Sequence, residues 1–332
     1  AMSQFSSAFM HSIMGVTLPA IGSDLEASGV ELGIAESIFM GTAAALLLPI
    51  GRFADVTDKN TLFKSGLLAL GITTFAIGFQ PSIESVIGAR FFQGVAAAFL
   101  TATGMAIVAD IAPRNRLGQM LGLAIGATYV GLAVGPYFAG LVTTHLGWRW
   151  VFYLAATPPI LSYLLSCATL KSQWHAPKKS VNLTNSALLF FSIMAFIAGA
   201  ATLKQTVMGT ALIALGVCMG ALFIIAERRS ADPLIKVEEV FANRALSQAL
   251  VIQFLIYCGT IGTTFLLSLY LQYIQGNTPE TTGNLLVLAP VVMAIFAPLA
   301  GRVADRMSPR RLSALGAASI LCSLVLATLI TE

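Results

Sequence analysis

Long apolar runs of about 18–25 residues, separated by short polar segments, follow one another along almost the whole chain. A helix needs a run of this length to cross the hydrocarbon core of a membrane. The pattern therefore predicts about eleven membrane spans. Their expected ranges are 5–22, 36–54, 62–80, 85–108, 117–142, 150–170, 186–203, 207–226, 247–272, 284–300 and 312–330.

The composition supports this interpretation. Of the 332 residues, 57% are hydrophobic and only 10% are charged, whereas a soluble domain carries about 25% charged residues. We expect an all-α integral membrane protein, embedded in a lipid bilayer.

Basic residues are confined mainly to alternate polar segments, and such an asymmetry sets the orientation of a membrane protein, because cytoplasmic loops are rich in Lys and Arg. We expect a cytoplasmic N-terminus and a location in the inner (plasma) membrane. The outer side then receives Arg149 and Lys204. The cytoplasmic side receives Lys59, Lys64, Arg114, Arg116, Lys171, Lys178, Lys179, Arg228, Arg229, Lys236, Arg244, Arg302, Arg306, Arg310 and Arg311.

A short motif recurs in the two parts of the chain. Gly51-Arg-Phe-Ala-Asp55 is repeated as Gly301-Arg-Val-Ala-Asp305, and each copy closes an apolar run. Repeated halves are how secondary transporters build a central site between two bundles. The spacing of the copies leaves room for one extra pair of spans. We therefore expect a six-helix bundle at 1–170, linkers with two additional spans at 171–246, and about three helices of a second bundle at 247–332.

Glycines dominate the segment from Gly118 to Gly140. On a helix they form two stripes on roughly opposite faces, the first at Gly118, Gly122 and Gly126, the second at Gly131 and Gly135. Small residues let helices approach closely in a membrane. The sequence therefore predicts a helix held between two neighbours, and it predicts a kink at Pro136, which has no N–H to donate.

Together these motifs resemble the major facilitator superfamily, in its fourteen-span drug–proton antiporter branch. The fourth-helix signature of that family is matched by Arg90, Gln93 and Gly94. The fifth-helix antiporter signature is matched by Gly122, Gly131, Gly135, Pro136 and Gly140. The loop signature is matched by Gly51, Asp55 and Lys59, and again by Gly301, Asp305, Arg306 and Arg310.

The match has three departures. Val56 and Asp58 stand where the family usually has arginine and glycine. The first helix of the branch normally carries an aspartate and a threonine, and the aligned positions here are Met10 and Ser12, with His11 between them. The chain also stops after what would be the eleventh span, so the resemblance implies that the last three spans are absent.

Arg90 is the single residue that most strongly indicates a functional role, because a charge inside a span costs about 2.5–3.5 kcal/mol on insertion scales. The resemblance implies that Arg90 acts in proton transfer; the alternative is that its side chain reaches out to the interface. His11 could take part, since histidine titrates near neutral pH, or it could simply be packed. Glu36 is expected at the outer start of the second span, where the helix dipole favours a carboxylate.

We expect Asp55 and Asp305 to pair across the cytoplasmic helix ends and lock the outward-facing state. The predicted substrate cavity lies between the bundles. Its walls are expected to include Phe39, Gln93, Phe99, Tyr129 and Tyr270.

The sequence thus predicts a proton-driven antiporter that exports amphipathic organic compounds. The alternatives are an uptake symporter of the same fold and a non-transporting membrane sensor. No nucleotide-binding loop, metal-ligand cluster or nucleophile–base set occurs, so no enzyme activity, cofactor, metal or nucleic-acid partner is expected.

Overall fold

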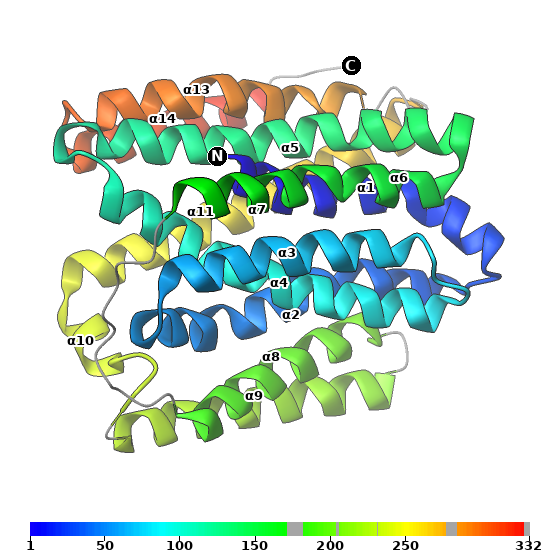
Figure 1. Ribbon diagram of the computed structural model, residues 1–332. Helices are drawn as coiled ribbons and strands as arrows, with labels where there is room; N and C mark the ends of the chain where they lie inside the picture. Colours follow the sequence, from blue (N-terminus) through cyan, green and yellow to red (C-terminus); the bar gives the residue numbers. More distant parts are fainter. Residues whose placement is uncertain (171–181, 204–205, 231, 277–283, 329–332) are drawn as a thin grey trace.

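The computed structural model describes residues 1–170, 182–203, 206–230, 232–276 and 284–328, and these segments contain helices and no strand (Figure 1). The all-α prediction is confirmed. Lys171, Lys178, Lys179 and Lys204 of the predicted basic pattern lie outside the described residues. The elements are α1 (Met2–Asp24), α2 (Gly29–Val56), α3 (Lys59–Ile77), α4 (Ile83–Ile111), η1 (Arg114–Arg116), α5 (Leu117–Leu146), α6 (Trp148–Ala155), α7 (Thr157–Thr169), α8 (Leu183–Ala201), α9 (Thr206–Arg229), α10 (Val237–Ala242), α11 (Arg244–Leu269), η2 (Tyr270–Ile274), α13 (Leu288–Ala304) and α14 (Pro309–Thr328).

Eight helical segments of the described chain are long and apolar enough to cross a membrane. They are 29–56, 59–77, 83–111, 114–146, 148–169, 183–201, 207–229 and 284–304. The three other predicted spans correspond to α1, α11 and α14, which have 23, 26 and 20 residues. In α1, polar side chains such as His11 make the helix less apolar.

Two predicted spans differ from the structure. The second begins at Gly29 and not at residue 36, because Ser28 and Glu31 form a capping box: the Ser28 backbone N–H donates to Glu31 Oε2 over 2.8 Å. Glu36 therefore lies two turns inside α2. The sixth span is divided into α6 and α7 at Ala156, just before two prolines that cannot donate helical hydrogen bonds.

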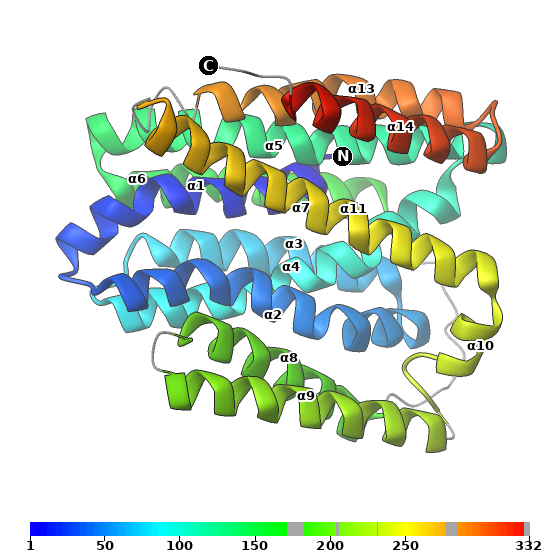
Figure 2. The ribbon, with the colours of Figure 1, turned by 180° about the vertical axis from the view of Figure 1, so that it is seen from behind.

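The helices lie roughly side by side, and α5 lies between two neighbouring helices (Figures 1 and 2). On one side α5 packs along α13, and on the other it packs along α1; α2, α3 and α4 form a further group. The pair α8 and α9 packs against α2. We call the end that carries the loops α2–α3, α4–α5 and α13–α14 the basic end; it lies at the left of Figure 1.

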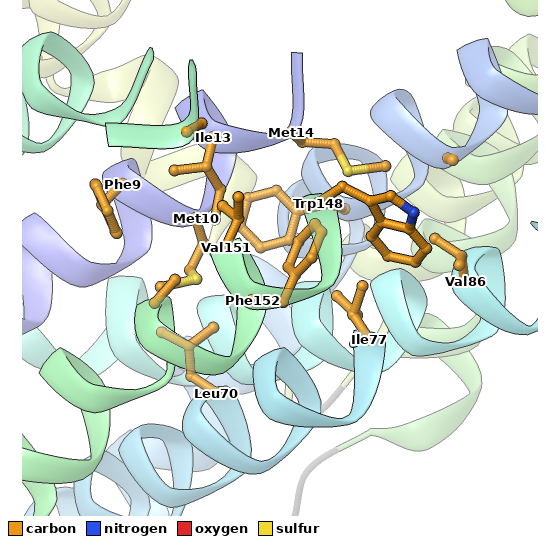
Figure 3. Close-up of a cluster of buried hydrophobic side chains, with 14 of the residues drawn as sticks. Phe9, Met10, Ile13, Met14, Leu70, Ile77, Val86, Trp148, Val151 and Phe152 are labelled. Carbon is orange, nitrogen blue, oxygen red and sulfur yellow. The ribbon is translucent and has the colours of Figure 1, made fainter. Parts of the chain in front are cut away.

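A hydrophobic core joins α1, α3, α4 and α6 (Figure 3). Met10 and Ile13 of α1 are fully buried against Leu70 of α3, while Phe152 and Trp148 of α6 fill the space beside them. Burying each large side chain of this kind is worth about 1.5–3 kcal/mol when water is the alternative. The core fixes α1 against α4, and this contact positions the polar groups described below.

An ion pair fastens the end of α1 opposite the basic end. Asp24 accepts hydrogen bonds from Arg149 and from the indole Nε1 of Trp148, the latter over 3.2 Å. The Arg149 guanidinium also lies 4.4 Å from the centre of the Trp148 ring. The hydrogen bonds from Arg149 and Trp148 hold the pKa of the Asp24 carboxyl below its usual value.

Asp24→Asn should therefore lower thermal stability at pH 7 slightly, since partly exposed pairs contribute about 0.2–1 kcal/mol. Because the pKa of Asp24 is depressed in the folded state, its contribution is complete above the usual carboxyl pKa and is lost as pH falls through the folded value. The melting temperatures of parent and variant in detergent should converge in acid. Glu26→Gln, an exposed neighbour, is the control, and a gap that widened in acid would contradict this assignment.

Candidate functional site

Arg90 is completely buried, with an exposed fraction of 0%. Its Nε donates to the carbonyl oxygen of Ala35 over 3.2 Å, and its Nη1 donates to the carbonyl oxygen of Met10 over 3.4 Å. Nη1 also donates to Oε1 of Gln93 over 2.7 Å. Helices α1, α2 and α4 thus hold the guanidinium between them. The alternative that Arg90 reaches out to the interface is wrong for this structure.

A short polar network extends from Arg90 into the core. Gln93 Nε2 donates to the Thr74 hydroxyl over 2.8 Å, and that hydroxyl donates to the Leu70 carbonyl oxygen over 2.6 Å. The Phe39 ring covers the guanidinium at 4.6 Å from its centre. On the side of Arg90 that faces Gln93, the hydrogen bonds of the network are made, and they fix the orientation of the guanidinium.

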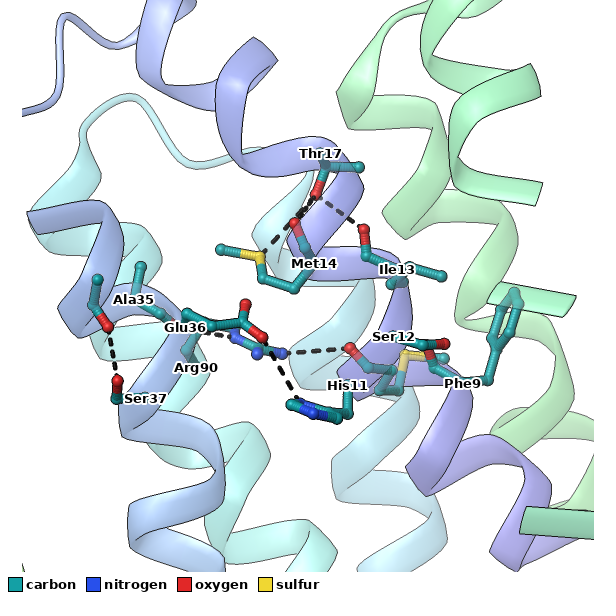
Figure 4. A network of polar contacts seen from close by, with 12 residues as sticks. Phe9, His11, Ser12, Ile13, Met14, Thr17, Ala35, Glu36, Ser37 and Arg90 are labelled. Carbon is teal, nitrogen blue, oxygen red and sulfur yellow. Dashed lines mark hydrogen bonds and ion pairs between the residues drawn. The ribbon is translucent and has the colours of Figure 1, made fainter. Parts of the chain in front are cut away.

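Glu36 and His11 lie on the other side of Arg90 (Figure 4). The distance from His11 Nδ1 to Glu36 Oε1 is 3.7 Å, and the two side chains are 33% and 30% exposed. Arg90 is close enough for its charge to interact with that of Glu36. Glu36 is thus not a helix-start carboxylate, as the sequence suggested, but a member of a three-residue cluster, which we call the Arg90 cluster.

The Arg90 cluster is incompletely bonded. Arg90 Nη2, Glu36 Oε2 and His11 Nδ1 are buried atoms that have no hydrogen-bond partner among the described residues. Buried polar atoms normally have partners, and an unmade bond costs about 1–3 kcal/mol. Three such atoms, from three helices, thus lie in one cluster.

The first glycine stripe of α5 faces α13. A Cβ atom at Gly122 would lie 2.5 Å from the Ala297 carbonyl oxygen, and one at Gly126 would lie 3.1 Å from the Ala294 carbonyl oxygen. The second stripe faces α1, since a Cβ atom at Gly131 would lie 2.6 Å from the Phe5 carbonyl oxygen. The prediction that this helix is held between two neighbours is confirmed, and the neighbours are α13 and α1.

The contact with α1 also carries a hydrogen bond. The Ser12 hydroxyl donates to the Gly131 carbonyl oxygen over 3.1 Å, and it also faces Gly135. Gly140 differs, because a Cβ atom there would meet only Val16, at 4.0 Å. Pro136 lies inside α5; the expected kink there stays a prediction.

Asp305 joins α13 to the beginning of α5. Its two carboxylate oxygens accept from the backbone N–H groups of Gly118, over 2.6 Å, and Gln119, over 2.9 Å. A carboxylate at a helix N-terminus satisfies free N–H groups and complements the dipole. Asp305 therefore caps a helix of the first part of the chain from a helix of the last part.

The other copy of the motif is arranged differently. Asp55 is exposed at the end of α2, and a Cβ atom at Gly51 would have free space, whereas Gly301 is buried against Gly118. Lys59 pairs with Asp110 over 3.1 Å and so links α3 to the end of α4. The expected pairing across helix ends is thus seen for Asp305 and not for Asp55 in the described residues.

Two cavities flank α13. The first, of about 780 Å³, opens at the basic end between η1, α5 and α13, and its lining includes Arg116, Arg302, Asp305 and Arg306. The second, of about 660 Å³, is largely apolar and lies between α11, the beginning of α13, and α14. Arg310, at the beginning of α14, is exposed.

Of the residues predicted for the substrate cavity, Phe39 and Gln93 meet at Arg90. Phe39 of α2 and Gln93 of α4 are both buried. In a helix bundle, a polar or aromatic residue can form contacts between helices as well as line a cavity. Phe99 packs beside Gly66 of α3. Tyr129 and Tyr270 are partly exposed on α5 and η2. Gly94, one turn after Arg90, is likewise packed against α2: a Cβ atom there would lie 2.5 Å from the Phe39 carbonyl oxygen.

Comparisons with known proteins agree with this architecture. The sequence matches the family described as Major Facilitator Superfamily over residues 1–331. The chain is 26% identical to the riboflavin transporter RibZ of Clostridioides difficile, across 91% of this chain and 66% of that protein. It is 26% identical to the tetracenomycin C resistance and export protein of Streptomyces glaucescens (90% and 56%), and 28% identical to the multidrug efflux pump LfrA of Mycolicibacterium smegmatis (92% and 61%).

The structure resembles that of the human organic anion transporter MFSD10 (TETRAN), with a TM-score of 0.58 at 16% sequence identity, over 92% of this chain and 72% of that one. At this identity the likeness concerns the fold. The chain spans 56% to 66% of the length of the three curated relatives named above.

Proposed function

Because the chain belongs to the Major Facilitator Superfamily, we propose that it acts in a proton-coupled antiporter that exports amphipathic organic compounds. We assign it to the fourteen-span drug–proton branch, with its N-terminus in the cytoplasm of the cell and its basic end facing that side. This orientation rests on the distribution of Lys and Arg between alternate loops.

The Arg90 cluster is the observation that carries the proposal. Ionisable groups inside a membrane bundle are costly, and they mark ion and proton pathways. Arg90 is fully buried and keeps its charge, so a carboxylate and an imidazole beside it form a site whose charge changes when one proton binds. A site of this kind can couple proton movement to a change of conformation.

The contact between α5 and α13 supplies the conformational element. We propose that Gly301 and Asp305, with Arg306 and Arg310 nearby, close the basic end by holding α13 against the start of α5. In this view Gly51, Asp55 and Lys59 form the corresponding element of the first repeat. Opening the basic end would break the two hydrogen bonds from α5 to Asp305.

The direction of transport is proposed from the relatives and from α5. Two of the relatives named above are an export protein and an efflux pump, and Gly122, Gly131, Gly135, Pro136 and Gly140 fit the antiporter signature. An uptake carrier is the second candidate, because the riboflavin transporter matches over a similar share of the chain.

A tolerance screen separates the two candidates. The protein, expressed from its full gene in a bacterial host without its main efflux pumps, should raise tolerance to several amphipathic compounds, and a protonophore should abolish the effect. Arg90→Ala is the inactive control. Unchanged tolerance across the panel, together with rescued growth of a riboflavin auxotroph on low riboflavin, would favour uptake.

A further inference from the structure

Among the described residues, Glu36 is the acidic side chain whose charge interacts with Arg90. It lies two turns inside α2, one turn before Phe39. The Phe39 ring contacts Arg90 and lies 14° from parallel to the His11 ring. Figure 4 shows the Glu36 carboxylate directed towards both Arg90 and His11. Met10 stands where the resemblance leads us to expect the helix-1 acid; its side chain lies in the hydrophobic core and its carbonyl oxygen accepts from Arg90.

We propose that Glu36 carries the transported proton, that it shares this proton with His11, and that Arg90 is a positioning residue for its carboxylate. This inference rests on the proposed function, and it assigns to α2 a task that the sequence did not indicate. No bond other than that of the proton is made or broken. The proton moves between a Glu36 carboxylate oxygen and Nδ1 of His11, and then to one side of the membrane.

The charges of the cluster balance in one protonation state. With Glu36 ionised and His11 neutral, the carboxylate compensates the charge of the fully buried Arg90. One added proton, on either Glu36 or His11, leaves the cluster with a net positive charge in a low-dielectric site, where such charges interact strongly. Proton binding therefore favours a rearrangement of α1, α2 and α4, the three helices that hold Arg90.

The geometry allows the proton to be shared. The distance of 3.7 Å between His11 Nδ1 and Glu36 Oε1 is longer than a hydrogen bond. A movement of less than about 1 Å would close it to hydrogen-bonding distance. Both side chains are about one-third exposed, so protons can reach them, and both have buried atoms without a hydrogen-bond partner among the described residues.

Other titratable groups lie away from Glu36. Of the helices packed against α2, α1 contributes His11 and ends at Asp24, and α4 contributes Arg90, with Glu84 and Asp110 near its two ends. The charged residues of α3, Lys59 and Lys64, lie at the basic end, and α8 has no ionisable side chain. The proton site is therefore confined to the Arg90 cluster.

The first test needs no substrate. Infrared pH titration of the full-gene protein in lipid vesicles should show a protonated-carboxyl band that is present in the parent protein and absent in Glu36→Gln. His11→Asn should shift the titration midpoint of this band. Glu84→Gln and His145→Asn change exposed residues of α4 and α5 and should leave it unaltered. A midpoint that His11→Asn did not move would overturn the shared proton.

The second test measures coupling in inside-out vesicles, with ethidium as the transported probe if the tolerance screen shows its export, and otherwise with the compound that the screen selects. Glu36→Gln should lose accumulation driven by a pH gradient by about 5- to 150-fold, the usual range of coupling between sites. Exchange of the probe at equal pH should persist, because it needs no net proton movement. Full pH-driven accumulation by Glu36→Gln would overturn the proposal. If the parent protein itself failed to transport, the proposed function would fall, and the infrared titration alone would decide the proton site.

Discussion

Arg90→Lys should still be inserted and folded, at lower stability, yet its proton-driven transport should fall at least about tenfold. Lysine keeps the positive charge but lacks the planar fork of the guanidinium. It cannot at the same time replace the bonds of Nε to Ala35 and of Nη1 to Gln93 and Met10. Each lost hydrogen bond to a charged group is worth roughly 1.5–3 kcal/mol, and a loss of 1.4 kcal/mol is already tenfold.

The matched control is Arg114→Lys, which changes an exposed arginine of η1. Transport should be measured with equal amounts of each variant in the membrane, and folding should be checked by size-exclusion chromatography in detergent. Normal pH-driven transport by Arg90→Lys would mean that only the charge of Arg90 matters, and the positioning role would have to be given up.

Gly122→Ala should impair transport or make the vesicles leak protons, although the change adds only one methyl group. The new Cβ atom would lie 2.5 Å from the Ala297 carbonyl oxygen and 3.1 Å from the Gly301 Cα atom, both backbone atoms that cannot rotate away. Overpacking of this kind costs about 1–3 kcal/mol. That is enough to shift an equilibrium between two conformations by roughly 5- to 150-fold.

The same helix supplies a second test position, Gly131, and a control position, Gly140. Gly131→Ala should have a similar effect through the Phe5 backbone of α1, whereas Gly140→Ala meets only Val16 at 4.0 Å and should be tolerated. Proton leakage is followed with a pH-sensitive dye inside the vesicles. Equal transport by the Gly122, Gly131 and Gly140 variants would show that transport does not need the close packing of α5 against α13 and α1.

Apolar run lengths predicted the helices and the fold class well, because membrane thickness imposes a nearly fixed length on each span. The glycine stripes likewise predicted that α5 packs closely on two faces. They could not show that α13 and α1 are the partners, because a stripe of small residues records close approach and not the identity of the neighbour.

Arg90 could be found from sequence because a lone charge in an apolar run is expensive. Hydropathy alone places Glu36 at the start of the second span, because the apolar run begins after it. The Ser28–Glu31 capping box was the available signal: a serine followed three residues later by glutamate places the start at Gly29. Its use would have put Glu36 inside the span and made its charge conspicuous.

The walls of a substrate cavity are harder to choose from sequence, for a physical reason. Gln93 and Phe39 are polar or aromatic residues in apolar helices, and such residues serve equally well to bond between helices or to line a pathway. The arrangement of α1, α2 and α4 around Arg90 places both residues in the packed interior of the structure.

The direction of proton movement tests the central claim most directly. Inside-out vesicles that contain the full-gene protein are acidified inside, and probe uptake and lumenal pH are followed together. The probe should accumulate as protons leave the lumen, and Glu36→Gln should lower this accumulation by about 5- to 150-fold. Accumulation that instead required protons to enter together with the probe would establish symport and contradict the account.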